Sequence, residues 1–367
     1  MFSDNHKISI RQLQAMLLLC CFGTASLFLP AELAADAQKS CWIVMGIGGL
    51  IATLFSLVLT QLYARQPSWT AMEWSRNTFG NTFGTILSVG FILKLAVDGM
   101  LELRIFTEIL QRIMLPHTPS WLMVLVLLLL ATFGVARGIE GQARIAEILF
   151  FFVFPPFLIL LLAVGVSVKE AYFLPVTLPD LTQIRKGAAV VQPLFQAMLF
   201  LLFVSPFLQK PKQAKKSVAL SLLFVTVLLM IVIFLCLSIY GVEALSKKMF
   251  PTLQMVECIG FSGIFLNRKD ILLLWFWTVS VFIYISGVLF FGSISTERLF
   301  CKGERKRRYW LFLWVPLLFL GAMFPKDMAS AYAFRNFVQP FVSAVYLGIF
   351  PICFLCKSIW KERRKSS

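Results

Sequence analysis

Long apolar stretches recur along almost the whole chain, separated by short polar segments. The hydrocarbon core of a bilayer is about 30 Å thick, so a helix needs about 20 mainly apolar residues to cross it. Stretches that meet this requirement, the ninth only barely, span residues 8–35, 41–64, 83–112, 119–136, 144–166, 188–208, 217–241, 270–296, 309–324 and 331–356. The pattern predicts an all-α membrane protein with ten transmembrane helices and a single domain, residues 1–367.

The first apolar stretch is interrupted in its middle by Gly23-Thr24-Ala25-Ser26. A helix in lipid must satisfy its own backbone hydrogen bonds, so an interruption is tolerated only inside protein or along a cavity. Broken helices of this kind build the central ligand site of secondary transporters. Small residues also let two helices pack closely. The interruption therefore predicts either a ligand site or a packing surface.

The sixth stretch carries Pro193 and Pro206 on either side of Gln196. Proline removes a backbone donor and bends or ends a helix. If the ten helices form two inverted halves of five, the first and sixth occupy corresponding positions. Interruptions in such a pair indicate a transporter-like binding site, so we predict a broken sixth helix as well as a broken first.

Charged residues are few but concentrated in the third stretch. A charge near the middle of a membrane helix costs about 2.5–3.5 kcal/mol, so such residues usually face the interior of a bundle. At about 100° per residue, they share an arc of about 160°: Lys94, Asp98, Glu102, Arg104 and Glu108. Lys94 and Asp98 fall near the midplane, and the other three toward the external surface.

Two interpretations of the Lys94–Asp98 pair stay open. Residues four apart on a helix can pair and neutralise each other, which would make burial tolerable and nothing more. Alternatively, the two charges form the wall of a cavity that binds a zwitterionic or polar ligand. Arg104 and Glu108 are expected to form a plain ion pair at the outer rim.

Composition supports a membrane protein, since 59% of the residues are hydrophobic and 14% are charged, against about 25% charged in soluble domains. The net charge of +16 could indicate nucleic-acid binding. With a cytoplasmic N-terminus, however, most Lys and Arg fall in cytoplasmic loops, which is the positive-inside pattern. We therefore expect two cytoplasmic termini, basic segments against anionic lipids, and no nucleic-acid partner.

Enzymatic motifs are not apparent in the sequence. Its two histidines, His6 and His117, lie outside the apolar stretches, and the cysteines are scattered. Neither a phosphate-binding loop nor a dinucleotide-binding glycine motif occurs. We predict a protein that is not an enzyme and has no cofactor or metal.

Several short motifs, in order and spacing, resemble the spore germination permease family, the B subunits of nutrient germinant receptors. They are the segment 7–13, Gly23 to Pro30, Glu102-Leu103-Arg104, Leu115-Pro116-His117-Thr118-Pro119, Gly138-Ile139-Glu140, Phe250-Pro251-Thr252-Leu253, and Arg268 leading to Trp277. The resemblance covers essentially the whole chain. No single motif is specific for the family, and the resemblance rests on the combination of the motifs.

The resemblance implies the amino acid–polyamine–organocation superfamily and its LeuT-like fold of five-plus-five inverted repeats. It also implies a location in the spore inner membrane, a small nutrient germinant (amino acid or sugar), and assembly with an A-type membrane subunit and a C-type lipoprotein subunit. The ligand-binding residues carried over from the family are Gly23, Thr24, Ala25, Ser26, Lys94, Asp98, Gln196, Leu199, Phe200, Ser280 and Tyr284.

Two departures from the family pattern bear on the ligand. Relatives often have glycine and an acidic residue where this chain has Ala197 and Phe200, and they can have neutral residues in place of the charged pair. The leading hypothesis is a ligand sensor whose bound state is read by partner subunits. The alternatives are an ion-coupled permease for an amino acid or polyamine, with Ser280 and Ser286 as possible ion ligands, and a membrane scaffold without a ligand.

Overall fold

A computed structural model describes residues 7–23, 25–165, 172, 177–191, 193–257, 269–300 and 307–366. These residues are almost entirely helical, and the β-structure among them is one isolated parallel bridge between Ile8 and Leu208. The all-α architecture predicted from the apolar pattern is confirmed.

The helices up to residue 165 are α1 (Ile10–Phe22), α2 (Ala25–Ala37), α3 (Cys41–Arg65), α4 (Ala71–Phe79), α5 (Asn81–Ile113), α6 (Ser120–Ala136) and α7 (Gly138–Val164). Those that follow are α8 (Leu181–Val190), α9 (Pro193–Met198), α10 (Leu201–Val204), α11 (Ala214–Ser246), α12 (Pro251–Glu257), α13 (Lys269–Phe300), α14 (Arg307–Met323), α15 (Met328–Ser343) and α16 (Phe350–Ser366). Short 3₁₀ turns at Gln38–Ser40, Ser205–Phe207 and Pro211–Gln213, and a π-helical segment at Ala344–Ile349, join them.

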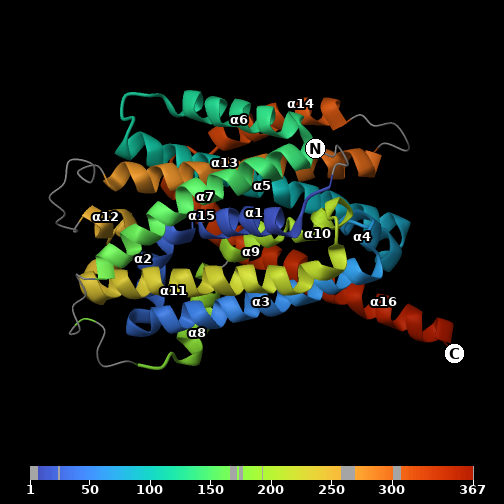
Figure 1. The fold of residues 1–367 in the computed structure, drawn as a ribbon, viewed down its shortest axis with the longest axis horizontal. Coiled ribbons are helices and arrows are strands. Elements are labelled where there is room, and N and C mark those ends of the chain that lie inside the picture. The colour runs from blue at the N-terminus through green and yellow to red at the C-terminus, as the bar shows by residue number, and fades with distance from the viewer. Residues whose placement is uncertain are drawn as a thin grey trace.

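Most of the long helices run along the longest axis of the molecule, as Figure 1 shows. The broken pair α1 and α2 lies inside the bundle: α1 packs against α7, α9, α11 and α13, and α2 packs against α11, α8 and α12. α5 packs on α13, α14 and α15. The start of α1 and the end of α16 lie toward the same end of the molecule (Figure 1).

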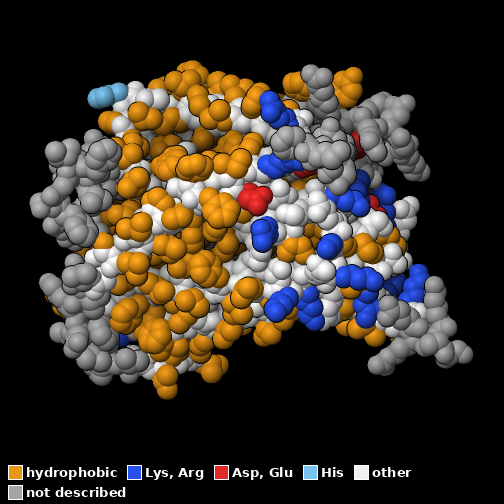
Figure 2. Space-filling model, viewed as in Figure 1, with side chains coloured by type: hydrophobic (Ala, Val, Ile, Leu, Met, Phe, Trp, Pro, Cys, Tyr) orange, Lys and Arg blue, Asp and Glu red, His pale blue; other side chains and the backbone are white. Residues whose placement is uncertain are grey.

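The outer surface suits a lipid environment. Large apolar side chains are exposed on it, among them Leu162 at 78%, Leu320 at 68% and Phe133 at 67%. A water-soluble monomer rarely exposes so large an apolar area. Figure 2 shows apolar side chains covering most of the middle of one face, with Lys and Arg gathered toward the end where α1 begins. The chain is an integral membrane protein.

Helices occupy each of the ten predicted ranges, although the number that crosses the bilayer stays a prediction. Among the described residues, five helical segments are long and apolar enough to cross, and a sixth is added if α14 and α15 form one bent span. The 33-residue α5 is also long enough, and its charged side chains at 94, 98, 102, 104 and 108 are buried.

The predicted break in the first helix is confirmed. α1 ends at Phe22, Gly23 has φ −46° and ψ −94°, and α2 begins at Ala25. The α1 helix starts with a capping box in which Ser9 Oγ accepts from the Gln12 backbone N–H while Gln12 Oε1 accepts from the Ser9 N–H. Such reciprocal bonds satisfy backbone donors that the helix itself cannot.

The predicted start of the sixth helix, residue 188, needs correction. Residues 188–190 are the end of α8, which begins at an Asp180 capping box and packs on α2 and α3. A separate helix, α9, starts at Pro193, where proline costs nothing because a first-turn N–H has no helical partner. α9 ends at Met198, and α10 begins at Leu201. The α-helical bonding of the sixth helix is therefore interrupted at Leu199–Phe200, where i→i+3 bonds replace it: Leu199 N–H donates to the Gln196 carbonyl and Phe200 N–H to the Ala197 carbonyl. This interruption is the second break.

Candidate functional site

The break between α1 and α2 lies directly against α13. A Cβ added at Gly23 would come within 2.4 Å of Ser280 Cβ, closer than real Cβ atoms approach. Glycine at this position is therefore required by the close approach of the two helices. The Gly23 carbonyl accepts from both the Ser26 backbone N–H at 3.3 Å and the Ser26 hydroxyl at 2.7 Å.

Ser26 ties the start of α2 to two neighbouring elements. Its hydroxyl accepts from Trp277 Nε1–H on α13 at 2.9 Å, and its carbonyl accepts from the Thr252 hydroxyl on α12 at 2.5 Å. The side chain is fully buried. Of the other residues predicted here, Ala25 is the first residue of α2, and Thr24 lies outside the described residues.

On α5, Lys94 and Asp98 form a buried ion pair. Lys94 Nζ lies 2.5 Å from Asp98 Oδ2 and 2.7 Å from Oδ1, and the side chains are 2% and 0% exposed. Gln196 on α9 donates from Nε2 to the backbone carbonyl of Asp98 at 3.4 Å. The predicted residues of the third and sixth helices are therefore in contact.

At the second break, Phe200 packs on α13. Its ring centroid lies 5.3 Å from that of Tyr284 and 5.2 Å from that of Phe291. A Cβ at Gly287 would come within 2.6 Å of the Phe200 ring, so this glycine makes room for the aromatic side chain. Leu199 beside it is completely buried.

Four buried hydroxyls on α13 have no hydrogen bond of good geometry in the described part of the chain: those of Ser280, Tyr284, Ser286 and Ser295. Of these, Tyr284 OH interacts with the side chain of Gln196. Leaving a buried polar group unsatisfied costs about 1–3 kcal/mol. Such atoms mark places where a ligand, an ion or a water molecule can bind. Ser280 faces the first break and Tyr284 packs on Phe200 at the second, so one of these hydroxyls lies at each interruption.

Sequence reasoning missed Arg335, a buried charge on α15, and its interactions with the acidic residues around it. Arg335 is 7% exposed and interacts electrostatically with Glu102, Glu32 and Asp98. Its guanidinium carbon lies 5.8 Å from the centroid of the Tyr332 ring. Glu102, placed toward the external surface from helical depth alone, is only 4% exposed. A charge inside a predicted span was the available signal, since such residues usually face the bundle interior.

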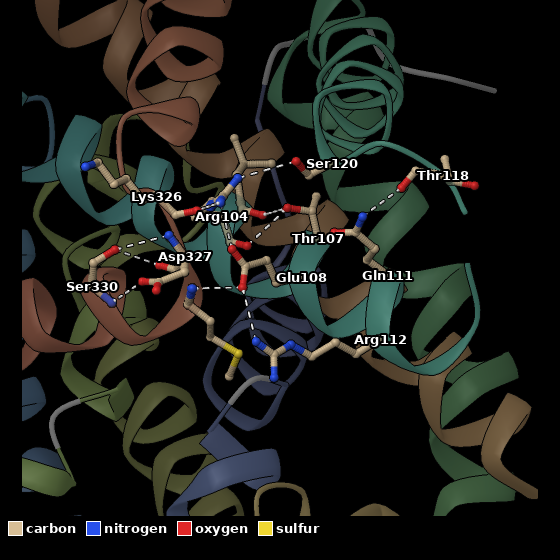
Figure 3. A network of polar contacts seen from close by, with 12 residues as sticks. Arg104, Thr107, Glu108, Gln111, Arg112, Thr118, Ser120, Lys326, Asp327 and Ser330 are labelled. Atoms are coloured by element: carbon tan, nitrogen blue, oxygen red, sulfur yellow. Dashed lines mark hydrogen bonds and ion pairs between the residues drawn. The ribbon is translucent and has the colours of Figure 1, made fainter. Parts of the chain in front are cut away.

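The predicted pair of Arg104 and Glu108 exists, with a separation of 2.8 Å, but each side chain is only 9% exposed. Figure 3 shows the two side chains directed at the turn between α14 and α15, where Arg104 donates to the Lys326 carbonyl at 2.6 Å. Glu108 accepts from the Met328 backbone N–H at 2.8 Å. Met328 begins α15, which is bent 108° from α14. The pair therefore holds a sharp turn.

Glu108→Gln is expected to loosen this turn. The amide oxygen can still accept from Met328 N–H, but the charge that pairs with Arg104 is lost, at a cost of about 1–3 kcal/mol. Thermal unfolding of the purified protein in detergent measures the loss. The matched control is Glu140→Gln, which removes the partner of the more exposed Arg144, and exposed pairs contribute about 0–1 kcal/mol. Equal effects of the two changes would contradict a structural role for Glu108.

Three features define a membrane protein of the transporter type: helices that are broken inside the bundle, buried charges beside the breaks, and an outer surface suited to lipid. The solved structure titled "Crystal structure of MhsT in complex with L-phenylalanine" shares this fold, with a TM-score of 0.67 over 94% of this chain and 87% of that one, at 12% identity. The LeuT-like fold is thereby confirmed.

The chain belongs to the spore germination protein family, whose model matches residues 7–331. It is 24% identical to spore germination protein YndE of Bacillus subtilis over 99% of both chains, and 23% identical to spore germination protein B2 of the same organism over 90% of both. Spore germination protein KB, also from Bacillus subtilis, is 22% identical over 99% of this chain and 97% of that protein. The family resemblance drawn from short motifs is confirmed; it is a family of transporter-like membrane proteins.

Proposed function

We propose that this chain is the membrane subunit of a spore germinant receptor. It binds a small nutrient germinant between the two helix breaks. Binding changes the conformation of the bundle, and partner subunits detect that conformational change. Membership of the germination family and the shared LeuT-like fold support this proposal. The observation that carries it is the pair of unsatisfied hydroxyls, Ser280 and Tyr284, at the two breaks.

The chemistry of the surrounding residues favours an amino acid over a sugar. Lys94 and Asp98 bind each other through one ammonium and one carboxylate. A zwitterionic amino acid carries the same two groups and can exchange with both partners, so that each buried charge keeps an opposite charge. Tyr284 OH offers a hydrogen bond, and the Phe200 ring offers an apolar wall.

Binding must be coupled to opening of the bundle. Lys94, Asp98, Gln196, Phe200, Ser280 and Tyr284 are each no more than 6% exposed, so a ligand reaches them only in a more open state. A ligand that prefers one of two states shifts their populations by its difference in affinity. This shift is the signal that partner subunits read.

The proposed partners are an A-type membrane subunit and a C-type lipoprotein, in the spore inner membrane. Both termini are cytoplasmic in this proposal. The basic residues favour that orientation, because Lys and Arg gather toward the end where α1 begins (Figure 2) and cytoplasmic segments are enriched in them. Anionic lipid headgroups at that surface are the partners of the basic end.

An ion-coupled amino acid or polyamine permease is the second candidate. The observation in its favour is that Ser280 and Ser286, two buried serines of α13, have hydroxyls without a partner in the described chain. In transporters with broken helices, unwound carbonyls help to coordinate the coupling ion. Here the Gly23 carbonyl already accepts two hydrogen bonds from Ser26, which favours the receptor.

Equilibrium binding and uptake in proteoliposomes, tested over the same amino acids and sugars, separate the two functions. We expect saturable binding of an amino acid without its accumulation. Tyr284→Phe, which removes the unsatisfied hydroxyl and keeps the ring, should weaken binding, and Tyr309→Phe, at an exposed position of α14, should not. Concentrative uptake would establish the permease instead, and no binding of any amino acid or sugar would remove the proposed pocket.

A further inference from the structure

A groove of about 310 Å³ lies between α1 and α7 on the outside of the bundle, away from the central site. Its walls are Arg11, Gln14 and Leu18 of α1, and Glu147, Phe150 and Phe151 of α7. Phe151 is 68% exposed. Because the surrounding surface is apolar, the groove faces lipid along one side.

Two opposite charges line this groove without a partner in the part of the chain that the structure describes. Within the described residues, neither Arg11 nor Glu147 has a hydrogen bond or ion pair, whereas Glu140, two turns earlier on α7, is paired with Arg144. A carboxylate on a lipid-facing surface is costly unless something pairs with it.

Arg11 lies in the first turn of α1, and Lys and Arg side chains gather toward the end of the molecule where α1 begins. That end corresponds to the headgroup level of the membrane. Glu147 is the tenth residue of α7, so it lies deeper along its own helix. A ligand that satisfies both groups must therefore carry an anion near the headgroup level and a cation within reach of Glu147.

We propose that this groove binds a phospholipid with a zwitterionic, primary-amine headgroup, of the phosphatidylethanolamine type. The guanidinium of Arg11 binds the phosphate, since arginine and phosphate form strong charge-assisted hydrogen bonds. The headgroup ammonium donates to Glu147, and an acyl chain packs on Phe150 and Phe151. An anionic lipid with a glycerol headgroup, such as phosphatidylglycerol, lacks the cation that Glu147 needs, and a choline headgroup has no N–H to donate.

The lipid-facing wall continues inward to the first helix break. Phe150 stacks on Phe154, with centroids 4.7 Å apart and an interplanar angle of 25°, and Phe154 packs against Phe22 at 6.4 Å. Phe22 is the last residue of α1 before Gly23. A lipid in the groove therefore supports the half-helix that leads into the break, and it does so whatever ligand occupies the central site.

Native mass spectrometry of the purified protein with added lipids tests the proposal. We expect phosphatidylethanolamine to bind more tightly than phosphatidylglycerol or phosphatidylcholine of the same acyl chains. Glu147→Gln should weaken phosphatidylethanolamine about tenfold, the effect of one charge-assisted hydrogen bond, with little change for phosphatidylcholine. Arg11→Gln should weaken all three lipids, because each has a phosphate. Glu140→Gln, on the same helix, should change none.

Equal affinities of the wild-type protein for the three lipids would overturn the proposal without any variant. So would a Glu147→Gln protein that keeps the wild-type preference. A photo-crosslinking phenylalanine analogue at position 151, used in membranes that contain the complete receptor, shows whether a lipid or a protein occupies the groove. A phospholipid adduct is expected, and an adduct with a membrane helix of another subunit would show that a protein fills the groove instead.

Discussion

Replacing Asp98 by Leu is expected to destabilise the protein more than replacing Lys94 by Met. Removing one partner of a buried pair leaves the other charge uncompensated, at a cost of about 3–5 kcal/mol. The effect is asymmetric here because Arg335 interacts electrostatically with both residues. It attracts Asp98 and repels Lys94. Membrane abundance and thermal unfolding of the two single variants measure the difference.

The double variant Lys94→Met with Asp98→Leu is expected to recover abundance and stability, since apolar residues of similar volume often replace a buried ion pair at little cost. It should nevertheless fail to bind the germinant, because both charges that a zwitterion needs are gone. Spore germination dose-response, measured with abundance, decides between the two roles of the pair. Normal abundance with an unchanged dose-response would remove both residues from the site.

Gly23→Ala is expected to have the second-largest effect. The new Cβ would lie 2.4 Å from Ser280 Cβ and 3.2 Å from the Leu19 carbonyl, and forcing atoms into a packed interior costs about 1–3 kcal/mol. α1 and α13 must separate at the break, so we expect lower thermal stability together with a lost germination response.

A second substitution tests this explanation. Ser280→Gly removes the atom that clashes, so adding it to Gly23→Ala should restore most of the stability, which a double-mutant cycle measures. The matched control is Gly134→Ala on α6, whose Cβ would meet only ordinary contacts at 3.5 Å or more. It should be neutral or stabilising by about 0.5–1 kcal/mol, as expected for Ala in a helix interior. A Gly23→Ala protein as stable as this control would contradict the close packing of the break against α13.

The asymmetry between the two breaks explains why one was easier to predict. The first is marked by Gly23 and small neighbours within a long apolar stretch, which sequence displays directly. The second falls at Leu199–Phe200, two large apolar residues that carry no local signal for an interruption. Pro193 and Pro206 only bracket it, and the packing of Phe200 against Tyr284 and Phe291 accompanies the break.

For the candidate site, the burial of side chains could be predicted from the sequence, but their hydrogen-bond partners could not. The arc shared by Lys94, Asp98 and Glu102 follows from helical periodicity alone, and all three are buried as that arc indicated. Ser26 was predicted from the same small-residue segment as Gly23, yet its hydroxyl is occupied by Trp277 and Gly23. No spacing rule relates residues 26 and 277, which are brought together by the fold.

The sequence by itself determined the all-α membrane class, the broken first helix and the family, because apolar length, small residues and motif order are local properties of the chain. Only the tertiary structure decided which polar groups pair and which stay unsatisfied. Arg335 interacts electrostatically with Asp98 and Glu102 of α5, and Arg104 and Glu108 hold the α14–α15 turn. Within the described residues, the hydroxyls of Ser280 and Tyr284 are among those without a hydrogen bond of good geometry. The physical reason is that satisfaction of a buried group depends on atoms from helices far apart in sequence, whose side chains meet only once the bundle has packed.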